Sequence, residues 1–172
     1  MRFKLVGNKL DITAVVIRNN DTVAIKVGAP VAQDFAGTLP GVDAKTVVSL
    51  AAAEQGGFFG IALADINPGD YGESQVYGYN SIARVVLAGR SATNATWSSI
   101  AAGSIGEYLT IATGTGTAGN QALIRVGTGA QTIAQFARLA ETFASTDTQA
   151  SSDGPQSQTQ WVSARKVFLR AM

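Results

Sequence analysis

Short apolar runs, separated by glycine-rich turns at intervals of roughly 8 to 12 residues, recur along almost the whole chain. Residues 71–80 show the strand pattern most clearly, because tyrosine and longer polar side chains alternate there with glycine, serine and valine. A period of two is typical of a β-strand. Since no strand-helix alternation is visible, we expect an all-β fold, a compact β-barrel or β-sandwich of about ten short strands with Gly-rich turns and little helix.

The most specific local signal is a turn of four residues, Asn67, Pro68, Gly69 and Asp70. Proline pre-sets the first central φ angle, and glycine supplies the positive φ that a type II turn requires at its second centre. An apolar run at residues 57–63 precedes this turn and the alternating segment follows it, which predicts a central hairpin. The second strand of the hairpin is expected to continue past a bend near Asn80.

The N-terminal part of the chain predicts another hairpin. Residues 11–18 and 21–27 are rich in valine and isoleucine, and turn-forming Asn and Asp residues lie between them. Pro30 then weakens any continuing central strand, because proline has no amide proton to donate to a neighbouring strand. We expect one β-rich domain over residues 1–172, with residues 1–20 as an N-terminal arm or edge hairpin.

Two later segments differ from the rest. The apolar residues of 132–143 fit one face of a helix and, less regularly, one face of a strand, so periodicity leaves both open. Residues 145–160 are polar and of low complexity, which predicts a long exposed loop.

Reactive side chains are scarce in this chain. It has no His and no Cys, which excludes disulfides and thiolate chemistry and removes the usual general base near neutral pH. Its 13 basic and 12 acidic residues leave a net charge of +1, which argues against a nucleic-acid partner. No apolar run reaches the roughly 18 residues that a membrane span needs, and the N-terminus does not resemble a signal peptide. We therefore expect no cofactor, no metal and no membrane partner.

Three motifs suggest chemistry and have simpler structural interpretations. The GTGTAG run at residues 114–119 matches a dinucleotide fingerprint, but the required helix is not predicted after it, so a flexible hairpin loop is favoured. Asp65, Asp70 and Glu73 form a possible carboxylate cluster for acid-base work or Ca²⁺, without the spacing of an EF-hand loop. The tyrosines of residues 71–79 suggest stacking on a ligand or, more commonly, an interface.

The central hairpin resembles a pattern in the capsid decoration (cement) proteins of tailed bacteriophages. The residues that carry the likeness are Gly60, Ile61, Ala62, Leu63, Asp65, Ile66, Gly69, Tyr71, Gly72, Gln75, Val76, Tyr77 and Gly78. Residues 23–31, 136–143 and 165–172 are also similar to that family. The resemblance implies a β-rich protein that usually trimerises and clamps neighbouring major capsid subunits from outside the head. It also favours a strand over a helix for residues 132–143.

From this resemblance we expect a structural virion protein, made in the bacterial cytoplasm, that binds the outer surface of an assembled icosahedral capsid. Its partners would be itself, as a homotrimer, and the major capsid protein. Residues 91–124 carry a single charge, Glu107, and are therefore cheap to desolvate in such an assembly. Candidate contact residues are Tyr71, Tyr77, Tyr79, Ile111, Leu123, Arg2, Lys4, Arg165, Lys166 and Arg170. The alternatives are another phage structural module, such as a head-fibre base or tail component, and, last, a carboxylate-dependent hydrolase.

Overall fold

The computed structural model describes residues 13–39, 41–46, 58–86, 102–111, 122–125, 137–144 and 162–169. These residues form nine strands and no helix, so the prediction of an all-β chain is confirmed for them. The strands are β1 (Thr13–Asn19), β2 (Pro30–Gln33), β3 (Asp43–Thr46), β4 (Phe58–Ala62), β5 (Tyr71–Val86), β6 (Tyr108–Ile111), β7 (Leu123–Arg125), β8 (Ala137–Leu139) and β9 (Val162–Leu169).

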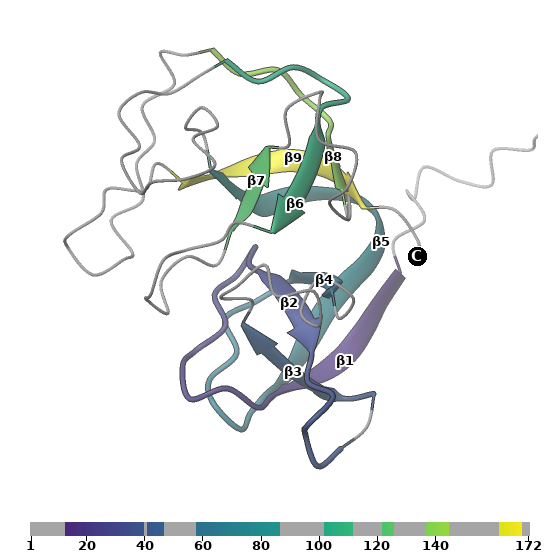
Figure 1. The fold of residues 1–172 in the computed structure, drawn as a ribbon, viewed down its shortest axis with the longest axis vertical. Coiled ribbons are helices and arrows are strands. Elements are labelled where there is room, and N and C mark those ends of the chain that lie inside the picture. The colour runs from purple at the N-terminus through teal and green to yellow at the C-terminus, as the bar shows by residue number, and fades with distance from the viewer. Residues whose placement is uncertain are drawn as a thin grey trace, which may run out of the picture.

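The strands pair as one mixed sheet in the order β1-β3-β2-β4-β5-β7-β6-β8-β9. Two additional pairings, β1 with β5 and β5 with β9, close this order into two circuits of five strands each. We call the circuit of β1, β3, β2, β4 and the first half of β5 the first ring. The second ring contains the second half of β5 with β7, β6, β8 and β9. Figure 1 shows the first ring at the bottom and the second at the top, with β5 passing through both.

The two rings have the same topology. In each ring the first strand along the chain pairs in parallel with the third, and every other pairing is antiparallel. The strand order in each ring is therefore 1-3-2-4-5, counted from that ring's own first strand. β5 is both the last strand of the first ring and the first strand of the second, so the chain contains one five-strand pattern twice.

The shared strand β5 is 16 residues long and bends between the rings. Gly78 lies at the junction with a φ of 95°, a conformation that favours glycine. The register between β5 and β9 shifts between Asn80 and Ala83, where the bend near Asn80 was predicted. β5 thus changes direction without ending, which lets one strand belong to two rings.

Each ring has its own apolar core. The first core consists of Ile17, Ile25, Ala29, Val31, Ala44, Ala62 and Ile66. The second consists of Ala32, Ile61, Ala83, Val85, Leu109, Leu123, Ala137, Leu139, Phe143, Val167 and Leu169. Ala32 and Ile61 come from β2 and β4 of the first ring but belong to the second core. Their neighbours Val31 and Ala62 point into the first ring, so Ala32 and Ile61 lie on its outer face, which packs against the second ring.

The predicted N-terminal hairpin is wrong. β1 pairs in parallel with β3 and antiparallel with β5, so it has a neighbour on each side and is not an edge strand. The buried side chain of Asn19 explains why the chain does not fold back on β1. Its amide nitrogen donates to the carbonyls of Val23 and Ile66, and its oxygen accepts from the amide of Asp21. These bonds direct the following segment toward Ile66, with which Ile25 forms an isolated bridge.

The expectation for Pro30 also needs correction, because this residue begins β2 and is paired with Ile61. Proline is accepted at the first position of a strand, where its missing amide is not needed. Of residues 132–143, for which a strand is favoured, Ala137–Leu139 form β8, residues 140–143 are not in a strand, and residues 132–136 lie outside the described residues. The low-complexity segment 145–160 and residues 1–12 lie outside the described residues.

Candidate interaction surface

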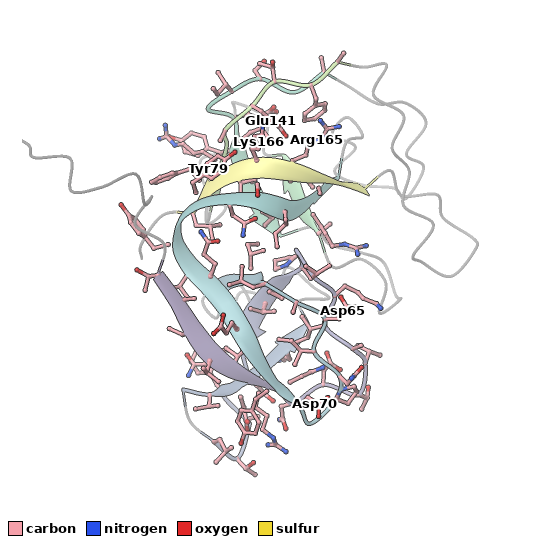
Figure 2. All side chains as sticks on the ribbon, turned by 180° about the vertical axis from the view of Figure 1, so that it is seen from behind. Asp65, Asp70, Tyr79, Glu141, Arg165 and Lys166 are labelled. Carbon is pink, nitrogen blue, oxygen red and sulfur yellow. The ribbon has the colours of Figure 1, made fainter. Side chains whose placement is uncertain are left out.

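Four side chains form a continuous row across the outer face of the second ring. Strand register places Tyr79 of β5 opposite Phe168 of β9, Phe168 opposite Arg138 of β8, and Arg138 opposite Tyr108 of β6. Directly opposed residues of antiparallel strands project from the same face. We call these residues the aromatic-arginine row. Figure 2 shows Tyr79 beside the curved strand β9, at the top of the molecule.

The flanking residues show that the row points outward. Val167 and Leu169 are fully buried on either side of Phe168, which is 42% exposed. Ala137 and Leu139 are likewise buried on either side of the exposed Arg138. Because side chains alternate along a strand, the inward positions fill the second core and leave the row facing solvent.

Three of the four side chains of the row have side-chain contacts that orient them. The guanidinium carbon of Arg138 lies 4.3 Å from the centre of the Tyr108 ring, and the same guanidinium donates a hydrogen bond to the Tyr108 hydroxyl. Phe168 meets the Tyr77 ring edge to face, with the ring centres 5.8 Å apart. Such contacts orient aromatic and cationic groups before any partner arrives.

The predicted tyrosine row is divided by the bend of β5. Tyr71 is 60% exposed and lies on the first ring, opposite Arg18. Gln75, predicted on the same face, is instead buried. Tyr77 and Tyr79 flank Gly78 at the junction and are half-buried. Gln75 stays on the face of Tyr71 and is buried because this part of the face packs against the second ring. The positive φ of Gly78 turns β5 after that point, so Tyr79 belongs to the second ring.

The prediction that Leu123 contacts a partner needs correction. Its side chain is fully buried in the second core and does not face a partner. Its neighbour Ile111 is paired with it through the β6–β7 ladder, but the Ile111 side chain lies outside the described residues. Residues 91–124 were expected to face a partner because they carry little charge. At Leu123 the apolar side chain packs inside the chain instead.

Two of the predicted basic contact residues have intramolecular partners. The Nζ of Lys166 lies 3.5 Å from a carboxylate oxygen of Glu141, and the Lys166 amide donates to the other oxygen. The guanidinium of Arg165 lies 4.9 Å from the centre of the Phe143 ring. Figure 2 shows Glu141, Arg165 and Lys166 gathered above β9. The other basic candidates, Arg2, Lys4 and Arg170, lie outside the described residues.

The three carboxylates considered for acid-base chemistry have local roles. Asp65 accepts the amide of Val27 at 2.7 Å and pairs with Lys26 at 3.1 Å. These two bonds, the amide first, lower the pKa of Asp65. Asp70 accepts from the side chain of Asn67 within the turn, and Glu73 is exposed. Among the described residues, no three acidic side chains are grouped in a way that would hold a metal ion.

The turn residues have the geometry of a tight β-turn. The amide of Asp70 donates to the carbonyl of Asn67 at 3.0 Å, and Gly69 has a φ of 82°. The GTGTAG run lies outside the described residues. The segment after it contains β7, so a strand stands where a dinucleotide site would need a helix.

Sequence reasoning missed three members of the row: Tyr108, Arg138 and Phe168. Alternation around Phe168 carried a usable signal, since apolar Val167 and Leu169 flank it. The row itself depends on which strands are neighbours, and this is not visible in the sequence.

No family model and no curated protein matches the chain. None of the residues that the structure describes belongs to a helix capable of spanning a bilayer.

Proposed function

We propose that this chain is a structural protein of a phage virion, which binds the outer surface of an assembled icosahedral capsid and stabilises it by bridging major capsid subunits. The observation that carries the proposal is the aromatic-arginine row. Tyrosine, phenylalanine and arginine are enriched in the buried centres of protein interfaces, where a few such residues supply most of the binding energy. The resemblance of the central hairpin to capsid decoration proteins selects the capsid among possible protein partners.

We further propose that each five-strand ring is a small closed barrel. Closure removes exposed strand edges, which protects a β-rich protein against unwanted pairing at high concentration. Two barrels built on one continuous strand would form a stiff body. Stiffness favours binding, because little conformational freedom is lost when the surface docks.

In this proposal the protein acts as a homotrimer and needs no cofactor. Several weak contacts made together raise the effective affinity by about 10² to 10⁴, so the protein would be retained on assembled shells but not on isolated capsid subunits. Its role would be structural and not enzymatic. Another phage structural module, such as a head-fibre base or tail component, is the alternative that the same surface supports.

Co-sedimentation with mature heads of the parent phage tests this function. The unmodified protein should pellet with heads, and a variant carrying Arg138→Ala and Phe168→Ala should remain largely in the supernatant. Phe35→Ala provides a matched control, because Phe35 is an exposed aromatic residue (69%) on the first ring, away from the row. If the unmodified protein fails to pellet with heads, the proposed function is wrong. Equal retention of the row variant would show that the row has no part in it.

A further inference from the structure

The repeated topology extends to individual hydrogen bonds. In the first ring, the amide of Gly28 donates to the carbonyl of Ala62 at 2.8 Å. In the second ring, the amide of Gly106 donates to the carbonyl of Leu139 at 2.7 Å. Three further sets of backbone amide-to-carbonyl bonds match in the same way. The bonds between Ile25 and Ile66 in the first ring correspond to those between Gly103 and Phe143 in the second. The bonds from Ala62 to Ala29 and from Leu63 to Glu73 correspond to those from Leu139 to Glu107 and from Ala140 to Lys166. The two rings can therefore be compared position by position.

Strand register gives the same correspondence around both rings. The positions that correspond by register are Arg18 and Arg84, Pro30 and Tyr108, Ala44 and Leu123, Ile61 and Arg138, and Gln75 and Phe168. Gly28 and Gly106 correspond through the hydrogen bonds above, and Val16 and Ile82 each lie two residues before the matched arginines. Each pairing in one ring predicts the corresponding pairing in the other. The comparison is thus fixed by the ladders and needs no similarity of side chains.

Inward positions of the two rings agree in burial, but outward positions differ. Ala44 and its counterpart Leu123 are both buried. On the outer face, Ile61 is fully buried, whereas its counterpart Arg138 is exposed. Pro30 and Gln75 are also buried in the first ring, because this face packs against the second ring. The aromatic-arginine row occupies the same face of the second ring, and Arg138 and Phe168 are exposed there.

Two corresponding glycines show most directly how the surroundings of the two rings differ. Gly28 and Gly106 have nearly the same backbone conformation, with φ of 78° and 83°. A Cβ added to Gly28 would lie 2.0 Å from the carbonyl oxygen of Ile82, and the Arg84 amide donates to the Gly28 carbonyl at 2.8 Å. Among the residues that the structure describes, none would lie within 4 Å of a Cβ added to Gly106. The position that β5 fills beside Gly28 is open beside Gly106.

The first ring also contains a counterpart of the strand that Gly28 contacts. Gly28 lies against β5 at Ile82, and the corresponding residue of the first ring is Val16 on β1. Val16 is 57% exposed, and Ile105, next to Gly106, is 67% exposed. One exposed apolar site thus lies on each ring, at positions that would come together if the ring-to-ring packing were continued by another molecule.

We propose that the face of the second ring around Ile105 and the aromatic-arginine row docks on β1 of a second copy of this chain. A second copy is the expected partner because the same kind of contact already exists within one chain. There the outer face of the first ring lies against β5 beside Gly28, and β1 is the counterpart of β5 in the first ring. The hydrogen bond from Arg84 is not repeated, because the corresponding Arg18 amide already donates to Val42. The contact between copies is therefore mainly apolar, with Ile105 and Phe168 of one copy against Val16 of the next.

Such a contact joins two different surfaces of identical chains. Contacts of this kind form a closed cyclic oligomer when the rotation between copies allows it, and otherwise they extend into a filament. The inference rests on the proposed function and deepens it, because it assigns the aromatic-arginine row to the contact between copies of the proposed homotrimer, on which retention by the capsid would depend. It concerns copies in solution, so it is tested without capsids.

Cysteine cross-linking provides the test, since the chain contains no Cys that would react in the background. Ile105→Cys and Val16→Cys are made as two separate variants, checked for unchanged thermal unfolding, mixed, and treated with a short thiol-specific cross-linker. We expect a covalent dimer containing one of each variant, identified by mass spectrometry, and a loss of this product when Phe168→Ala is added to the Ile105→Cys chain.

A mixture of Ile105→Cys with Phe35→Cys is the matched control, because Phe35 is at least as exposed as Val16 and also lies on the first ring. Absence of the Ile105–Val16 product, or an equal yield in the control mixture, would overturn the inference. In either case co-sedimentation of the unmodified protein with heads would be unaffected, so the two proposals fail separately.

Discussion

The side-chain amide of Asn80 donates a hydrogen bond to the side-chain oxygen of Gln75 at 3.0 Å, and both residues are buried at the bend of β5. The Gln75 amide donates in turn to the carbonyls of Tyr77 and Tyr79, and the Asn80 oxygen accepts from the amide of Ile82. These bonds satisfy backbone groups that the bend removes from regular pairing. The junction between the rings is therefore held by a polar network inside an otherwise apolar contact.

Replacing Gln75 with leucine should lower the free energy of unfolding by about 2–4 kcal/mol, because several buried polar groups would lose their partners together. Chemical denaturation measures the change. Glu73→Leu on the same strand is the control, since Glu73 is exposed, and it should alter stability little. Equal effects of the two substitutions would contradict a structural role for the network.

Gly69→Val should destabilise the fold by on the order of 1–3 kcal/mol, because a β-branched residue resists the φ of 82° found there. The cost comes from backbone conformation, since a Cβ at this position would meet no atom of the described part of the chain within 4 Å. Gly69→Asn should cost less, because asparagine also tolerates this position of a type II turn. Thermal melts of both variants that match the parent would show that the turn does not depend on glycine.

Gly28→Ala and Gly106→Ala form a matched pair that measures the contact between the rings. Both substitutions place a Cβ at a φ near +80°, which costs on the order of 1–2 kcal/mol. Gly28→Ala also forces a carbon against the backbone of Ile82, so its total cost should reach about 3–5 kcal/mol. Urea unfolding of the two variants under one set of conditions gives the difference. Similar losses would mean that the rings separate easily at Gly28.

Stability should fall in acid through Asp43. The amide of Leu39 and the guanidinium of Arg18, in that order of importance among the groups that favour its ionised form, lower the pKa of this buried carboxyl from 3.8. Since the folded-state pKa lies below the unfolded one, the stabilisation is fully present above pH 3.8 and is lost as the pH falls through the folded-state pKa.

Melting temperatures measured from neutral pH down to acid should therefore decline below that value. Asp43→Asn should show a shallower decline, because it removes the titrating group and keeps an oxygen for the Leu39 amide. Asp70→Asn, at an exposed turn position, is the control and should follow the parent. A decline in Asp43→Asn as steep as in the parent would assign the acid sensitivity to other groups.

Local chemistry determined much of the secondary structure. Period-two alternation placed a strand at residues 71–80, and β5 covers it. Proline followed by glycine predicted a turn with positive φ at its second centre, and Gly69 has that conformation. These features were visible in the sequence because each depends on the conformational preferences of a few adjacent residues.

Only the tertiary structure decided which strands are neighbours. β1 pairs with β3 and β5 instead of forming a hairpin with the next segment, because the Asn19 side chain binds that segment elsewhere. Leu123 points into a core, and Phe168 points out beside Arg138, through pairings between residues far apart in sequence. The repeated ring, its open face beside Gly106 and the aromatic-arginine row all follow from those pairings. Burial and ladder closure select them over the whole chain, so no short stretch of sequence contains that information.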